Sequence, residues 1–126
     1  MRKLVLVAIA AVAVTTGTLA GQTPAQTPAP TAAQLAASIK AGEKVYTDQK
    51  CSTCHSVAGV GSKMAPLDGV GAKLTAADIR LWMTDPDAAA AKLPVKPKIK
   101  MKKYTLKDED LNALVSYLAS LKTIKK

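Results

Sequence analysis

The stretch CSTCH, residues 51–55, contains both cysteines of the chain and its only histidine. Within these positions lie the three side chains best suited to binding a metal or to redox chemistry. Three kinds of site use such a pattern: a redox-active dithiol, part of a zinc site, and the attachment point of a covalently bound haem. The rest of the sequence must distinguish among them.

Zinc requires four protein ligands, or three and a water molecule, and the chain has no other cysteine or histidine to complete the set. A Cys-x-x-Cys dithiol lowers the pKa of a thiol, which suits redox exchange in an exported protein. It usually lies, however, at a strand-to-helix junction of an α/β fold, and no strand alternation is visible here. Haem accounts for all three residues, because Cys51 and Cys54 on one helical turn can add to its two vinyl groups while His55 ligates the iron.

Residues 1–20 have the features of an export signal. Arg2 and Lys3 form a basic start, an uninterrupted apolar run follows, and small residues lead up to Ala20. The pattern predicts a signal peptide cleaved near Ala20, and therefore an exported, periplasmic protein. If it stays uncleaved, the same run is nearly long enough to anchor the chain in a membrane.

Residues 21–34 alternate proline with alanine, threonine and glutamine, which predicts an extended linker. The folded domain is therefore expected over residues 35–126. The chain has no phenylalanine, one tryptophan and three tyrosines, although aromatic side chains normally supply much of the area of a core. A large apolar prosthetic group would fill the space that aromatic side chains leave.

The apolar periodicity is helical throughout and predicts an all-α domain. Capping boxes are expected where helices begin, at Thr31, Thr75 and Thr105. Irregular segments are expected over residues 56–74, which are rich in glycine, and 87–104, which are rich in lysine. The predicted helices cover residues 32–49, 76–84 and 106–121, with a short helical turn at 88–91.

From about Ala41 onward the sequence resembles the class I c-type cytochromes, small all-α electron carriers with one covalently bound haem. AGEKVYTDQKCSTCHSVAG (residues 41–59) resembles their N-terminal helix running into the haem motif. MAPLDGVG (64–71) resembles their Gly/Pro-rich turn and DIRLWMTDP (78–86) their middle helix. IKMKKYTLKDEDLNALVSYLASLK (99–122) resembles their ligand loop and C-terminal helix. The resemblance implies the cytochrome c fold, in which the N- and C-terminal helices cross.

The same resemblance implies the residues that hold the haem. Cys51 and Cys54 would attach it, and His55 would be one axial ligand of its iron. Met101, in the irregular segment before the last helix, would be the other, although Lys102 follows it where proline is common in the family. Of the other methionines, Met64 is expected to be a packing residue beside the histidine and Met83 a core residue.

Further roles follow from the family pattern. Pro66 matches the residue whose carbonyl holds the second ring nitrogen of the histidine. Trp82 is expected either to hydrogen-bond a haem propionate or to be an ordinary core aromatic. Gly42, Tyr46 and Tyr117 match the positions at which the terminal helices cross.

The formal net charge is +9, of which Arg2 and Lys3 supply two charges, so +7 remains after cleavage. Seven lysines and no acids lie in residues 92–107, which predicts an anionic partner. Nucleic acid is disfavoured by export and by the single arginine of the domain. Acidic redox proteins are expected on this lysine-rich face, and a membrane only if the N-terminal segment is retained. The face comprises Lys96, Lys98, Lys100, Lys102 and Lys103.

These features predict a periplasmic electron carrier rather than an enzyme. Two other functions stay open at this point. The chain is alternatively the haem subunit of a periplasmic dehydrogenase complex, held permanently against its partner. It is otherwise a haem protein with an open iron position, which binds small ligands or reacts with peroxide.

Overall fold

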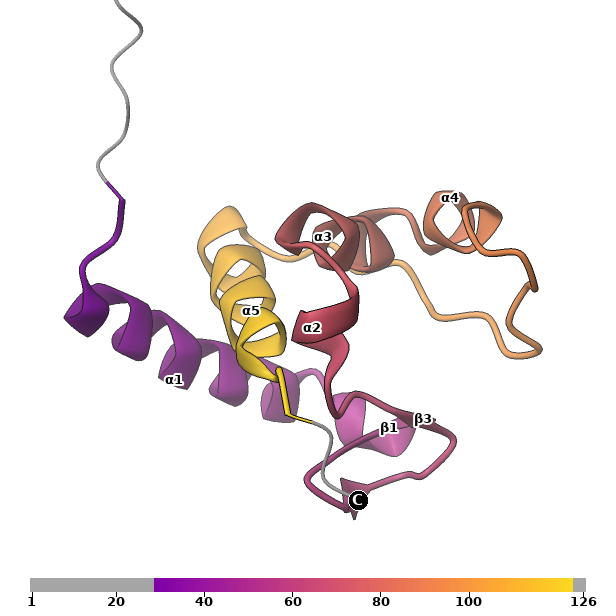
Figure 1. The fold of residues 1–126 in the computed structure, drawn as a ribbon, viewed down its shortest axis with the longest axis horizontal. Coiled ribbons are helices and arrows are strands. Elements are labelled where there is room, and N and C mark those ends of the chain that lie inside the picture. The colour runs from indigo at the N-terminus through magenta and orange to yellow at the C-terminus, as the bar shows by residue number, and fades with distance from the viewer. Residues whose placement is uncertain (1–28, 124–126) are drawn as a thin grey trace, which may run out of the picture.

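The computed structural model describes residues 29–123, and this part of the chain is mostly helical (Figure 1). The predicted signal peptide, residues 1–20, and most of the predicted linker lie outside the described residues. No helix within residues 29–123 has both the length and the apolar character needed to cross a membrane. The elements are α1 (Ala32–Asp48), the 3₁₀ turn η1 (Cys51–Thr53), β1 (His55–Val57), β2 (Val60–Gly61), β3 (Ala65–Pro66), α2 (Val70–Lys73), α3 (Ala76–Thr84), α4 (Pro86–Ala91) and α5 (Asp108–Ser120).

The predicted capping boxes at Thr31 and Thr75 are confirmed, and each begins a helix, α1 and α3 respectively. In both, the threonine side chain accepts a hydrogen bond from the N–H of the third helical residue. The side chain of that third residue in turn accepts a hydrogen bond from the N–H of the threonine. Asp85 ends α3, and its side chain then caps α4 by accepting from Ala88 N–H at 3.0 Å. The expected helical turn at 88–91 is thus part of a slightly longer helix.

The predicted cap of the last helix was wrong. Helix α5 begins at Asp108, and Lys107 at its N-cap makes no side-chain hydrogen bond. The chain is still irregular at Thr105 because the N–H of Tyr104 is bonded to the carbonyl of Met83 on α3, at 2.8 Å. The acidic first turn of α5 instead stabilises this helix end through the positive pole of the helix dipole.

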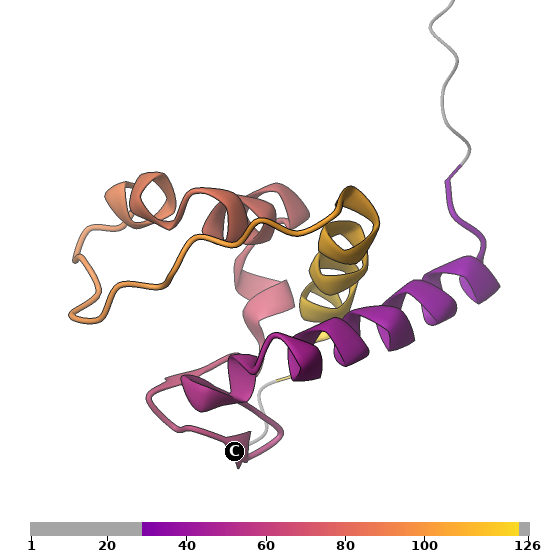
Figure 2. The same ribbon diagram turned by 180° about the vertical axis from the view of Figure 1, so that it is seen from behind.

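Helices α1 and α5 cross and pack closely, which confirms the predicted arrangement of the terminal helices (Figures 1 and 2). A Cβ atom on Gly42 would lie 2.6 Å from both the Cβ of Tyr117 and the carbonyl carbon of Ala113. Only glycine permits this approach. Beside the crossing, the rings of Tyr46 and Tyr117 meet edge to face with their centroids 5.8 Å apart.

The glycine-rich segment 56–74 is more ordered than the sequence predicted. Strand β1 pairs antiparallel with β2 and parallel with β3, and these strands are too short to show an alternating pattern. Helix α2 follows, and at Gly71 it approaches α5 as closely as α1 does, because a Cβ there would lie 2.6 Å from the carbonyl carbon of Ala119. The segment therefore wraps from the CSTCH motif back onto the C-terminal helix.

The core lies where α1, α3 and α5 meet. Ile79 on α3 and Leu114 on α5 are its most deeply buried large side chains. Met83 is 6% exposed, so its predicted place in the core is confirmed. Several apolar side chains next to this core are only partly buried, among them Trp82, Met101 and Tyr104. They border the space between the core and the segment that leads into α5.

Candidate functional site

The CSTCH motif forms one tight turn at the end of α1. Lys50 adopts a left-handed conformation (φ 55°), which reverses the chain after the helix. Within the 3₁₀ turn that follows, the N–H of Cys54 donates a hydrogen bond to the carbonyl of Cys51 at 3.2 Å. The two cysteines are not bonded to each other, and Cys51 is buried while Cys54 is exposed. The two sulfurs are thus presented from a single turn, as the spacing predicted.

The imidazole of His55 is held in one orientation and one tautomer. Its Nδ1 lies 2.8 Å from the carbonyl oxygen of Ala65. Because a carbonyl only accepts hydrogen bonds, Nδ1 carries the proton and Nε2 keeps its lone pair for a metal. Tyr46 on α1 steadies the main chain of the same residue by donating its hydroxyl to the carbonyl of His55 at 3.3 Å.

The prediction that Pro66 supplies this carbonyl was wrong by one residue. In the parallel pairing of β1 with β3, His55 lies opposite Ala65, and the N–H of Ala65 donates to the carbonyl of Cys54 at 3.2 Å. This register places the Ala65 carbonyl against the imidazole. Pro66 instead lines, together with His55, a largely apolar cavity that reaches the core. Nothing in the sequence marked Ala65, because its role depends on strand register alone.

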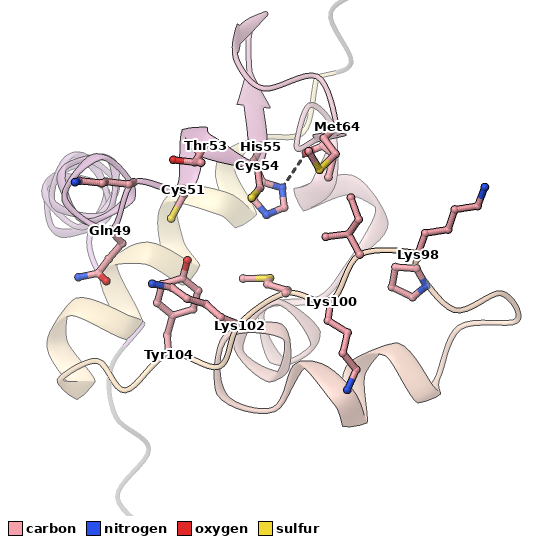
Figure 3. A pocket seen from close by; sticks show the side chains of 15 residues that line it. Gln49, Cys51, Thr53, Cys54, His55, Met64, Lys98, Lys100, Lys102 and Tyr104 are labelled. Carbon is pink, nitrogen blue, oxygen red and sulfur yellow. Dashed lines mark hydrogen bonds between the residues drawn. The ribbon is translucent and has the colours of Figure 1, made fainter.

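Two adjoining cavities open beside the motif. The outer cavity, about 660 Å³, is lined by the CSTCH turn and by the lysine-rich segment before α5 (Figure 3). The inner cavity, about 380 Å³, reaches down to the core. Cys51, His55 and Met101 line both. The inner walls are almost entirely apolar and include Leu67, Val70, Leu74, Ile79, Trp82, Met83, Leu114 and Leu118.

The lysine-rich segment lies across the outer cavity from the CSTCH turn. In Figure 3 Lys100 and Lys102 lie on this segment, and the side chain of Lys100 points away from the turn that carries His55. Met101, between them in sequence, lines both cavities and is partly buried. The structure therefore brings Met101 together with Cys51 and His55, although 46 residues separate it from the histidine in sequence.

The other predicted residues have distinct positions. Trp82 is half-buried on α3 and lines the inner cavity, which suits either of its expected roles. Met64 is 58% exposed and lines the outer cavity, so its role as a packing residue beside the histidine stays a prediction. It lies between β2 and β3.

The surroundings of Cys51 argue against its acting as an activated thiol. Burial raises the pKa of the Cys51 thiol, and a hydrogen bond with Tyr104 and the charge of Lys102 oppose this only in part. A raised pKa keeps the thiol protonated at neutral pH, whereas redox dithiols depend on a lowered one. Tyr104, which sequence reasoning did not single out, has its own pKa raised to about 12, chiefly by burial.

The chemistry of these side chains fits a haem. The cavity volumes lie within the roughly 300–1,000 Å³ of typical cofactor pockets. Their apolar walls match a porphyrin, the two thiols can form its thioethers, and an imidazole nitrogen and a thioether sulfur are both known haem-iron ligands. Within residues 29–123, no group of three or more His, Cys, Asp or Glu side chains gathers in a way that could hold a bare metal ion.

Comparisons with known proteins agree with this chemistry. Searches of curated proteins and of solved structures found no significant match. A family model, described as cytochrome c, matches residues 39–122. This range includes the CSTCH turn, both cavities and the crossing of α1 with α5. The chain therefore belongs to the cytochrome c family, with one covalent haem c and the electron-transfer role typical of that family.

Proposed function

We propose that the protein is a periplasmic electron carrier in which His55 and Met101 are the axial ligands of the haem iron. The observation that supports this most directly is that both residues line the same two cavities as Cys51, yet come from different segments. The export pattern of residues 1–20 supports the periplasmic location. When bound, the haem supplies one-electron exchange between ferric and ferrous iron.

Each side chain has a separate task in this proposal. His55 presents Nε2 in a fixed orientation, because its other nitrogen is bonded to Ala65. The soft thioether of Met101 favours ferrous iron and so raises the reduction potential. The apolar walls of the inner cavity exclude water, which also disfavours the extra positive charge of the ferric state. Neither ligand has to leave during the electron transfer.

The ligand set can be tested by absorption spectroscopy on protein matured in a host that exports it and attaches haem. We expect the reduced bands of a c-type haem that resists acid–acetone extraction, since Cys51 and Cys54 form thioethers. In the ferric protein we expect the weak long-wavelength band of methionine–iron coordination. Colourless protein, or haem that is lost on extraction, would contradict covalent attachment. Covalent haem without the long-wavelength band would contradict only the role of Met101.

The lysine-rich face supports the proposal of an acidic redox partner. Lys98, Lys100 and Lys102 line the mouth of the outer cavity. Two lysines of the segment are already paired with acids: Lys100 with Asp87 at 2.8 Å and Lys92 with Asp78 at 3.4 Å. These pairs are exposed and contribute little to stability. The unpaired lysines of the segment give the mouth of the outer cavity a positive potential, which would steer the anionic surface of a partner toward it.

We expect reversal of three of these charges, Lys96→Glu, Lys98→Glu and Lys103→Glu, to slow electron transfer to an anionic reagent. At low ionic strength the reduced variant should react with ferricyanide about tenfold more slowly than the unmodified protein, and the difference should shrink as salt is added. Stopped-flow kinetics measure this rate. Because the spectrum should be unchanged, the loss can be assigned to encounter rather than to the haem.

A matched control makes the same change in charge elsewhere, with Lys40→Glu, Lys44→Glu and Lys122→Glu. These exposed lysines lie outside the lysine-rich segment, residues 92–107. Their reversal should slow the reaction only about twofold, through net charge alone. Equal slowing by both sets would contradict a focused role for the lysine-rich face.

One observation favours a second candidate, the permanently bound haem subunit. Val95 and Ile99 are 78% and 57% exposed and alternate with lysines in the segment that lines the outer cavity. Exposed apolar side chains at one place suit a lasting interface better than a brief encounter. A partner that stays bound in high salt during purification from the native host would favour this candidate over the free carrier.

A further inference from the structure

The segment that carries Met101 has few main-chain attachments. Between Pro94 and Leu106 it makes one main-chain hydrogen bond with the described part of the chain, from the N–H of Tyr104 to the carbonyl of Met83 on α3, at 2.8 Å. Pro94 and Pro97 have no N–H to donate. A segment with so few hydrogen bonds has low local stability. Apart from the exposed ion pair of Lys100 with Asp87, its position therefore depends strongly on the residue that makes this main-chain bond.

The side chain of Tyr104 makes contacts on the opposite side, toward the haem-attachment turn. In Figure 3 its hydroxyl points toward the sulfur of Cys51. Both side chains line the outer cavity. The ring lines the outer cavity and packs beside the core cluster. Lys102 Nζ lies 4.6 Å from the centroid of this ring, a cation–π contact.

We propose that Tyr104 is the positioning residue for Met101: it joins the ligand segment to α3 through its main chain and to the Cys51 turn through its side chain. The proposal rests on the proposed coordination of iron by Met101. Tyr104 does not touch the iron itself. It acts through the chain, since only two residues separate it from Met101, and one of them, Lys102, packs on its ring.

The consequence is a shift in population. With both attachments in place, the segment is confined to conformations in which Met101 faces the cavity that it shares with His55. Without the side-chain attachments, conformations with Met101 displaced become more frequent, and the iron is open for a larger fraction of the time. An external ligand reports this fraction directly, because its apparent binding depends on the population that can bind it.

The test uses the haem-loaded protein and two variants, Tyr104→Phe and Tyr104→Ala. The first removes only the hydroxyl and the second also removes the ring. Binding of carbon monoxide to the ferrous protein should become about threefold faster in Tyr104→Phe and about tenfold faster in Tyr104→Ala. The long-wavelength ferric band should weaken in the same order. Tyr117→Phe removes the same atom from the crossing of α1 and α5 and should leave both readouts unchanged.

The outcomes separate this inference from the proposed function. If the unmodified protein shows the long-wavelength band but both Tyr104 variants retain it fully and bind carbon monoxide at the unmodified rate, Tyr104 does not position Met101. If the unmodified protein lacks the band, the coordination itself fails. Thermal unfolding of Tyr104→Phe checks for a merely structural effect. A lowered Tm with unchanged band and binding rate would also overturn the inference.

Discussion

Replacing Met101 with alanine is expected to change the haem site more than any other single substitution outside the CSTCH motif. If Met101 ligates the iron as proposed, its thioether is lost. We expect no other sulfur to replace it, because Met83 is packed into the core wall of the inner cavity and Met64 lies on the side of His55. The ferric protein should lose its long-wavelength band. The ferrous protein should bind carbon monoxide at once instead of waiting for a ligand to leave.

The reduction potential of Met101→Ala should fall as well. A thioether favours ferrous iron, and water or a harder ligand in its place does not. We expect a decrease on the order of 100 mV, a modest part of the roughly 0.8 V over which ligands and surroundings tune haem proteins. Redox titration followed by absorption measures it.

Met64→Ala is the matched control, since Met64 also lines the outer cavity. It should keep the band, the potential and the slow binding of carbon monoxide. If Met64→Ala instead loses the band while Met101→Ala retains it, the ligand has been assigned to the wrong methionine. If the unmodified protein already binds carbon monoxide readily, its iron has an open position and the electron-carrier proposal fails.

The helices were the most predictable part of this protein. The capping boxes at Thr31 and Thr75 are local, since each involves a side chain and an N–H three residues away, so they could be read directly from the sequence. The cap expected at Thr105 has the same pattern and failed. There the main chain at Tyr104 is held by α3, a distant contact that local pattern does not contain. Tertiary structure overrode propensity at this helix end.

The candidate site was likewise predictable where it depends on residues close in sequence, and not where it depends on contacts between distant segments. Cys51, Cys54 and His55 lie within five residues, so their spacing limited the site to three kinds of chemistry, and the rest of the sequence favoured haem. The place of Met101 required the family pattern, because no periodicity connects it with His55. Ala65 was missed in favour of Pro66 because the histidine's partner is set by pairing of β1 with β3. Tyr104 was missed because its role arises only when Cys51 and Met83 lie on either side of it.

Replacing Gly42 with valine is expected to have the largest effect on stability. Even its Cβ would lie 2.6 Å from Tyr117 Cβ, and the close neighbours on α5 include main-chain atoms, which cannot rotate away. The helices must move apart, which exposes core residues beside the crossing. Overpacking alone destabilises by about 1–3 kcal/mol, and partial loss of the crossing should bring the total to about 4 kcal/mol or more. Denaturant unfolding of the haem-loaded protein measures this loss.

Ala41→Val tests whether the effect arises from the crossing or from valine in a helix. Ala41 is the exposed neighbour of Gly42 on α1, so valine there loses only helix propensity, about 0.6 kcal/mol. Gly42→Ala provides a milder probe if the valine variant does not fold. Helix propensity alone would make Gly42→Ala stabilising by up to about 1 kcal/mol, so a net destabilisation can come only from the contact with α5.

Because α1 leads directly into the CSTCH turn, separation of the helices should also displace the turn that holds His55 and weaken the methionine–iron band. Unchanged stability in both Gly42 variants would mean that the helices do not cross in solution as they do here.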